Sequence, residues 1–198
     1  MKSLMIFAVI IFGLSPFLSA QINFENLSLN EALEKAKNEN KLVFVDVFAP
    51  WCGPCKMLSA NVFPDKELGE FMNQSFVNIK IDGDQDDNRK VMEEFDLRAF
   101  PTLLMINPNT NNIRKIEGYA EADEIIQEGQ YAIDPSITPV AKMKNSLFED
   151  PSRENHRDLL NAMIEDRSMN DEELNQETTA FLKKYPKLDL DKEMELYV

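Results

Sequence analysis

The stretch Cys52-Gly53-Pro54-Cys55 constrains the fold of this chain more than any other, because of what lies on either side of it. Residues 42–48 before it are apolar and β-branched with one acid, Asp46, which is typical of a buried strand. A helical pattern follows, so we expect both cysteines at a strand-to-helix turn. The free N–H groups and the dipole at a helix start favour thiolate over thiol. Cys52 is therefore the expected nucleophile.

Cys55 lies three residues further on, about one helical turn away. At that distance its sulfur can attack a mixed disulfide formed at Cys52 and release the bound partner. The four residues therefore predict a complete two-step redox cycle.

The cysteine count argues that this pair serves chemistry. Both cysteines of the chain lie in the one motif, so none is left for a structural bridge. A structural zinc site would need two more ligands, and His156 is the one histidine of the chain. We therefore expect no metal and no cofactor.

An acidic turn after residue 81 raises a separate possibility, calcium. Asp82, Asp84, Asp86 and Glu93 stand at the spacing of an EF-hand loop, but Asp87 occupies the position where the sharp turn needs glycine. The alternative is that these acids favour the start of the following helix through its dipole.

The formal net charge of −14 argues against nucleic acid as a partner, because phosphate binding needs clustered Lys and Arg. Residues 1–20 contain Lys2, an apolar run over residues 4–14, and Ser19-Ala20 before Gln21, which predicts a signal peptide. An uncleaved anchor is the alternative, although the run is shorter than a span of about 20 residues. We expect an extracytoplasmic protein, periplasmic or secreted, with no stable membrane insertion after signal removal.

The hydrophobic pattern predicts a three-layer α/β domain over residues 21–135, with a mixed sheet between helices. Strands that are joined through helices are expected to be parallel, and a final hairpin should add an antiparallel edge. The expected elements are an edge strand or arm within 21–27, helices at 29–39, from Cys52 with a kink or restart at Asp65, at 88–95 and at 122–131, and strands at 42–48, 76–82, 101–106 and 113–116.

Residues 136–198 differ in composition and predict a small all-helical extension. Two apolar helix faces are visible, one around Leu159 and Met163 and one around Leu174 and Phe181. An extension of this size is near the lower limit for folding alone, so we expect it to lean on the main domain or to pair with itself. His156 is expected to be a solvent-exposed helix residue.

The predicted signal peptide and the segment Asn61-Val62-Phe63-Pro64-Asp65 resemble extracytoplasmic thiol-disulfide interchange domains of the thioredoxin-like family. Several further motifs together resemble the thioredoxin-like family as a whole. They are Trp51-Cys52-Gly53-Pro54-Cys55-Lys56, the strand acid Asp46 six residues before Cys52, and the later Phe100-Pro101-Thr102. The resemblance covers roughly residues 25–133. It implies the thioredoxin fold and thiol-disulfide chemistry.

The resemblance also implies a role for each matching residue. Cys52 would attack and Cys55 would resolve, as the redox-active disulfide, while Asp46 would lie buried beneath Cys55 as its proton acceptor. A carboxyl inside an apolar strand has a raised pKa, which suits proton exchange near neutral pH. The substrate-binding residues would be Trp51, which shields the thiolate, Gly53, Pro54, Phe100, a cis Pro101 and Gly118.

One departure from the family concerns the partner of the buried acid. Many thioredoxins carry a lysine on the strand facing it, and counting back from Asp82 places that position at Asn78. Lys80 lies two residues later on the same face. The sequence leaves open whether Lys80 can take this role.

The sequence thus predicts a thiol-disulfide oxidoreductase that acts on protein disulfides and receives electrons from an unidentified donor. The Gly-Pro spacer resembles that of reducing members, with potentials near −270 mV against about −120 mV for strong oxidants. We therefore expect reduction or disulfide exchange. Two alternatives stand beside it: a binding or chaperone-like module whose interface is the helical extension, and an electron carrier dedicated to one partner protein.

Overall fold

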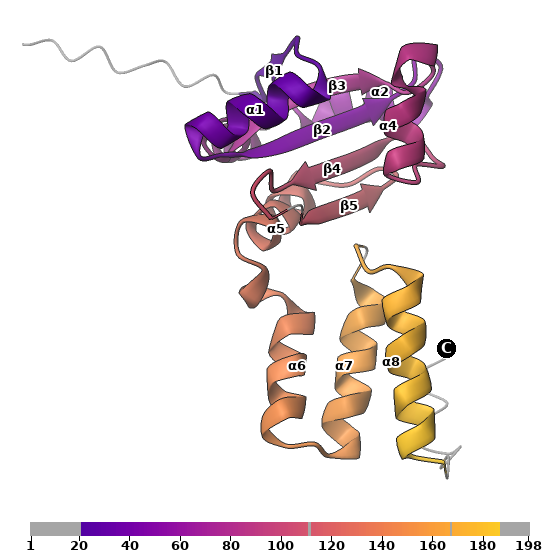
Figure 1. The fold of residues 1–198 in the computed structure, drawn as a ribbon. Helices are drawn as coiled ribbons and strands as arrows, with labels where there is room; N and C mark the ends of the chain where they lie inside the picture. The colour runs from indigo at the N-terminus through magenta and orange to yellow at the C-terminus, as the bar shows by residue number, and fades with distance from the viewer. Residues whose placement is uncertain (1–20, 111, 167, 187–198) are drawn as a thin grey trace, which may run out of the picture.

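The computed structural model describes residues 21–110, 112–166 and 168–186, so the expected signal peptide lies outside the described residues. A five-stranded sheet in the order β1-β3-β2-β4-β5 forms the centre of the main domain (Figure 1). In chain order the elements are β1 Phe24–Glu25, α1 Leu29–Glu39, β2 Leu42–Phe48, α2 Gly53–Met57, η1 Leu58–Val62, α3 Lys66–Ser75, β3 Phe76–Asp82, η2 Asp86–Asn88, α4 Arg89–Glu94, β4 Thr102–Ile106, β5 Ile113–Glu117, α5 Ala122–Ile133, η3 Pro135–Ile137, α6 Pro139–Glu149, α7 Arg153–Glu165 and α8 Asp171–Lys184.

Local sequence signals place the helix starts. Helix α1 begins with a capping box, in which the Ser28 hydroxyl accepts from the Glu31 N–H and the Glu31 carboxylate accepts from the Ser28 N–H. The predicted restart after Pro64 is confirmed, because Asp65 caps α3 by accepting from the Leu68 N–H at 2.9 Å. Between α2 and that restart the chain forms a π-helical turn, η1, which the sequence pattern does not distinguish from α-helix.

Strands joined through helices were expected to be parallel. This prediction is confirmed for β2 and β3 and is wrong for β4. Strands β2 and β3 are parallel, but β4, which follows β3 through α4, runs antiparallel to β2. Phe48 of β2 lies opposite Asp82 at the end of β3, and its neighbour Val47 lies opposite Thr102 at the start of β4. The chain therefore re-enters the sheet at the same end, and β4 begins where β3 stopped. The β4–β5 hairpin is antiparallel, as predicted.

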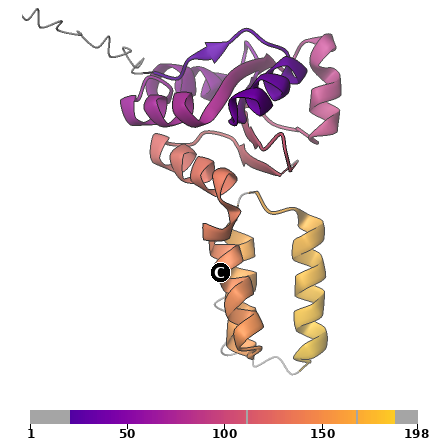
Figure 2. The ribbon, with the colours of Figure 1, turned by 60° about the vertical axis from the view of Figure 1, so that its left-hand side comes forward.

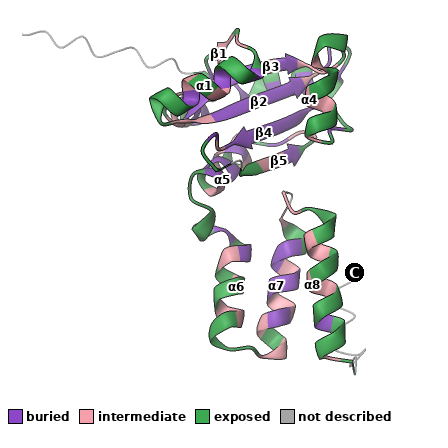
Figure 3. Ribbon diagram, viewed as in Figure 1, coloured by how far each residue is buried: buried purple, intermediate pink, exposed green. Residues whose placement is uncertain are grey.

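Helices cover both faces of the sheet. On one face α1 and α4 pack over Val43, Val45 and Ile79, and on the other η1, α3 and α5 pack over Phe44 and Leu103. Figure 3 shows the resulting band of buried residues through β2, β3 and β4. The alternation along β2 therefore turns its three valines to one face, and Phe44 with Asp46 to the face of the redox helix.

The C-terminal extension contains three helices in the described part, one more than predicted. Helix α6 was missed although Thr138 caps it and Pro139 occupies its first turn, a common start signal. Figures 1 and 2 show the three helices beyond the β5 edge of the sheet, on the side away from β1.

The expectation that His156 is exposed was wrong. Its ring is 4% exposed and lies between α7 and α8, with its centroid 5.1 Å from that of Phe181, and Nε2 is 2.7 Å from the Glu177 carboxylate. A single histidine in a polar helix does not indicate which way it faces, and its contacts Glu177 and Phe181 lie more than 20 residues further along the chain.

Candidate redox site

The two cysteines form a disulfide at the start of α2, with their Cα atoms 5.4 Å apart. Cys52 is the N-cap, and its sulfur accepts a hydrogen bond from the Cys55 N–H at 3.1 Å. Both residues are buried, 3% and 4% exposed, in a small cluster with Ala49 between Phe48 and Phe100. The predicted strand-to-helix placement is confirmed.

Trp51 lies on the surface beside this cluster, with 66% of its area exposed. Its ring meets that of Phe100 edge-on, with centroids 5.7 Å apart, and its indole N–H donates to the Asp84 carboxylate at 3.1 Å. Two contacts therefore fix the orientation of the indole next to the disulfide.

Asp84 and Gly83 belong to the acidic turn after β3, and the sequence analysis did not place either of them at the redox site. Gly83 donates to the Phe48 carbonyl at 2.8 Å, and a Cβ at this position would lie 2.6 Å from the Phe100 ring. Its lack of a side chain therefore lets Phe100 pack over the turn. The sequence shows the charge of this turn, but it does not show that the turn lies next to the cysteine motif.

The same turn is folded by its own hydrogen bonds. Asp82 accepts from the Asp84 N–H at 3.1 Å and from the Gln85 side chain at 3.0 Å. Within residues 21–110, 112–166 and 168–186, no three acidic, histidine or cysteine side chains are grouped so that they could hold a metal ion.

The Phe100–Pro101 peptide bond is cis, as the resemblance implied. Pro101 is buried at the start of β4, and its carbonyl accepts from the Gly118 N–H at 2.8 Å. Gly118 has φ +85°, a conformation that favours glycine, and it directly follows β5. The structure therefore brings Gly118 to Pro101, and Phe100 to the disulfide cluster.

Asp46 is the acid of β2 and is 1% exposed. One carboxylate oxygen bonds the Lys80 ammonium, and the other has no hydrogen-bond partner in the described residues. Burial raises the pKa of the Asp46 carboxyl, and the nearby Lys80 charge opposes that rise without cancelling it. The group is thus biased toward holding a proton.

Lys80, not Asn78, is the partner of the buried acid. The parallel register of β2 and β3 sets Lys80 directly opposite Asp46, whereas Asn78 lies opposite Phe44 and bonds Asn73 instead. The lysine side chain also donates to the Ser59 hydroxyl at 3.3 Å. Counting along one strand could not settle this point, because the register between two strands decides it.

A hollow of about 520 Å³ opens beside Lys80 and Cys55. It is lined by Phe48, Ala49, Pro50, Cys55, Lys56, Ser59, Ala60 and Lys80. Cys55 and the lysine of the Asp46–Lys80 pair therefore border the same hollow. This arrangement suits proton transfer between Cys55, the ion pair and water.

Comparison with known proteins agrees with this geometry. The family model for the thioredoxin-like domain matches residues 29–133, more than half of the chain. The chain belongs to the thioredoxin-like family.

Two relatives of this thioredoxin-like chain are named for disulfide chemistry. The thiol:disulfide interchange protein DsbD of Haemophilus influenzae is 26% identical over 109 residues, which cover 52% of this chain and 19% of DsbD. The protein disulfide-isomerase of Triticum aestivum is 26% identical over 110 residues, which cover 56% of this chain and 21% of that protein. The chain thus spans about a fifth of the length of each relative.

A solved structure gives a more complete match. The solution structure of a disulphide-isomerase candidate from Bacteroides thetaiotaomicron is 36% identical with a TM-score of 0.52, and the match covers 59% of this chain and 96% of that one. Among the described residues of the present chain, none of the helices is long and apolar enough to cross a membrane.

Proposed function

We propose that this thioredoxin-like chain is a thiol-disulfide oxidoreductase that reduces or exchanges disulfides in proteins. The observation that carries the proposal is the Cys52–Cys55 disulfide at a helix start, together with the Asp46–Lys80 ion pair, whose lysine borders the same hollow as Cys55. The relatives' names support the same chemistry.

In the proposed cycle the reduced Cys52 thiolate attacks one sulfur of a substrate disulfide. A bond forms between Cys52 and that sulfur, and the other substrate sulfur leaves as a thiolate that takes up a proton. Cys55 then attacks the Cys52 sulfur, which frees the second substrate thiolate and closes the disulfide of the enzyme. Two electrons pass from the enzyme to the substrate, and a donor must return them.

Asp46 is proposed to accept the Cys55 proton in the second step. The raised pKa of Asp46, caused by burial, brings its affinity for a proton closer to that of a thiol. Lys80 keeps the ionised form accessible by pairing with it. Trp51, Phe100, Pro101 and Gly118, with Gly53 and Pro54 of the spacer, are proposed to receive the substrate chain.

The test is insulin-disulfide reduction with a chemical reductant. Cys52→Ala should abolish the enzyme-dependent rate, and the exposed, distant Ser136→Ala should leave it unchanged. Retained activity in Cys52→Ala would defeat the mechanism. Cys55→Ser should accumulate mixed disulfides, and their protein partners would identify the substrates and the electron donor.

The direction of electron flow is proposed to be reductive, on the basis of the Gly-Pro spacer. Equilibration of the pair with a redox buffer should give a potential nearer −270 mV than −120 mV. A value near −120 mV would reverse the proposed direction while leaving the exchange chemistry intact.

We propose an extracytoplasmic location, supported by the apolar segment before Gln21, which has the pattern of a signal peptide. N-terminal sequencing of the protein recovered from the extracytoplasmic fraction should begin at Gln21. Recovery of the full-length chain from the cytoplasm would contradict this location.

A further inference from the structure

The edge strand β5 is met by the loop between α7 and α8, although they are about 50 residues apart in sequence. The Lys115 N–H donates to the Ser168 hydroxyl oxygen at 3.2 Å, and the same hydroxyl lies 3.4 Å from the Lys115 carbonyl oxygen. These are backbone groups of an edge strand, which usually bond water or another strand. A side chain of the extension occupies them here.

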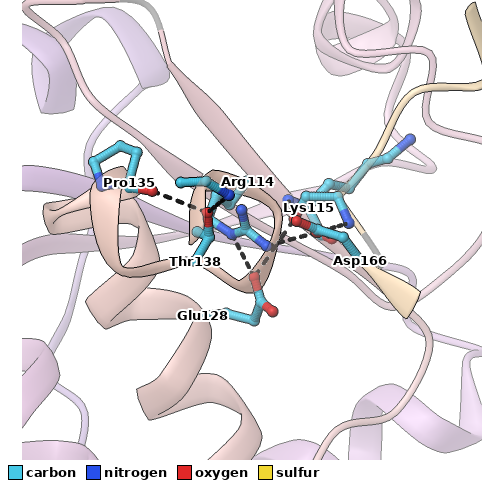
Figure 4. A network of polar contacts seen from close by, with 8 residues as sticks. Arg114, Lys115, Glu128, Pro135, Thr138 and Asp166 are labelled. Atoms are coloured by element: carbon cyan, nitrogen blue, oxygen red, sulfur yellow. Dashed lines mark hydrogen bonds and ion pairs between the residues drawn. The ribbon is translucent and has the colours of Figure 1, made fainter. Parts of the chain in front are cut away.

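A buried charged cluster holds this contact in place. Arg114 of β5 donates to Glu128 of α5 at 2.5 Å and to Asp166, at the end of α7, at 2.7 Å (Figure 4). All three side chains are about one-tenth exposed, and the Arg114 guanidinium also lies over the Tyr131 ring. Buried charges are tolerated where hydrogen bonds satisfy them, so the position of Asp166 is strictly defined.

The same carboxylate folds the loop. Asp166 accepts from the Ser168 N–H at 2.9 Å as well as from Arg114. Arg114, Asp166 and Ser168 therefore form one connected unit, which we call the β5 clasp. The clasp joins the extension to the sheet through the Arg114–Asp166 and Lys115–Ser168 hydrogen bonds, which form only when the two parts are docked.

The strand held by the clasp leads directly to the redox site. Three residues after Lys115 stands Gly118, whose N–H bonds the Pro101 carbonyl at 2.8 Å. In the β4–β5 register Lys115 faces Leu104 and Glu117 faces Thr102, the residue after Pro101. A shift of β5 at its clasped centre would therefore move the contact at Pro101.

We propose that the helical extension is a positioning element of the redox site. Its α7–α8 loop takes the place of a further strand at the β5 edge and, through the β5 clasp, keeps Gly118 beside Pro101 where a substrate chain lies. The substrate part of this inference rests on the proposed function. A second consequence is that the clasped edge cannot pair with another strand at Lys115.

The experiment removes the extension's half of the clasp in the full-length chain, with the double variant Asp166→Ala/Ser168→Ala. Amide hydrogen exchange at Lys115 should accelerate by about tenfold or more, as expected when local protection is lost. For insulin reduction, KM should rise about three- to tenfold with kcat changed less than about twofold, as for a loss of substrate binding.

Two further variants sharpen the result. Lys144→Gln removes an exposed α6–α8 ion pair of 2.7 Å within the extension and should change neither Lys115 exchange nor KM. Ser168→Ala alone should accelerate Lys115 exchange, whereas Ser168→Thr, which keeps the hydroxyl, should restore protection. Ser168 is a half-buried loop residue, so these single changes still test the clasp if the double variant folds poorly.

The outcomes separate the clasp from the proposed function. Unchanged Lys115 exchange in Ser168→Ala and in the double variant would overturn the clasp. Faster exchange with an unchanged KM would overturn the positioning role. A wild-type chain without reductase activity would refute the proposed function, and amide exchange would still report on the clasp.

Discussion

Asp46 has two features that destabilise the fold: its carboxyl group is buried in the core, and one oxygen of that carboxyl has no hydrogen-bond partner among the described residues. The side chain has 1% exposure, and only one of its oxygens is bonded in the described residues. A buried polar atom without a partner costs roughly 1–3 kcal/mol. The chain thus carries a destabilising group at the position where the proposed cycle uses a proton acceptor, a common compromise at functional sites.

Asp46→Asn should therefore stabilise the fold at neutral pH. Below the unfolded-state pKa of about 3.9 both states hold the proton, so the variant should resemble the wild type. Above it the unfolded carboxyl ionises first, because burial raises the pKa of Asp46 in the fold, and the wild type loses stability as pH rises toward that folded-state pKa.

Urea unfolding at pH 3.5 and pH 7 measures this difference. We expect the Asn variant to gain roughly 1–3 kcal/mol over the wild type at pH 7 and little at pH 3.5. An Asn variant that is less stable than the wild type at pH 7 would contradict the view that the buried Asp46 carboxyl destabilises the fold.

Lys80→Met should move the pH profile of mixed-disulfide resolution toward higher pH. The ammonium lowers the pKa of Asp46 against the effect of burial, so its removal raises that pKa and delays ionisation. Single-turnover release of a substrate thiol across pH measures the shift. The matched variant Lys56→Met lines the same hollow and should leave the profile in place. Coincident profiles for Lys80→Met and the wild type would remove Lys80 from the proton path.

At the scale of elements, the N-terminal arm is held by a close backbone approach to α3. Gly69 of α3 lies against Gln21, and a Cβ there would be 2.7 Å from a Gln21 backbone atom. The arm is further fixed by the Ile22 N–H, which donates to the Phe63 carbonyl at 3.1 Å. Strand β1 therefore reaches β3 because one glycine makes room for it.

Gly69→Ala should lower stability although alanine is the better helix former. Helix propensity favours alanine by about 1 kcal/mol, whereas overpacking against backbone costs roughly 1–3 kcal/mol. Thermal unfolding followed by circular dichroism should show a lower Tm. Gly53→Ala is the matched change, because a Cβ at that position meets nothing within 4 Å. A Tm of Gly69→Ala at or above that of the wild type would show that the arm can move aside.

Elements whose signals are local were predictable, and those that depend on distant contacts were not. Strands β2 and β3, the α1 capping box and the restart at Asp65 follow from periodicity and capping residues within a few positions. The antiparallel β4 depends on the end of the sheet at which the chain re-enters, and the Asp46–Lys80 pair depends on inter-strand register. Neither quantity is periodic along the sequence.

The cysteine motif could be named from its own local pattern, and Asp46 and the cis Pro101 could be named because the short motifs around them resemble the thioredoxin-like family. Asp84 could not, since its contact with the Trp51 indole joins two turns 33 residues apart. The β5 clasp is more distant still, as Arg114 and Asp166 are separated by 52 residues. Long-range polar contacts of this kind are set by the packing of the whole chain.

At the scale of the whole molecule, the formal net charge of −14 acts on every approaching partner. A net potential of one sign steers oppositely charged molecules and raises their association rate, and salt screens it over about 8 Å at physiological ionic strength. Charge should therefore influence which disulfides are reduced quickly, without altering the exchange chemistry itself.

Two peptide disulfides with the same core sequence, one flanked by lysines and one by glutamates, test this effect. At low ionic strength the cationic peptide should be reduced faster, with a ratio of kcat/KM of about tenfold or more, and the ratio should fall toward one in 1 M salt. Because screening acts on encounter, kcat should stay similar for both peptides. A ratio that is independent of salt would assign the preference to local contacts near Trp51 and Gly118, and a faster anionic peptide would contradict steering by net charge.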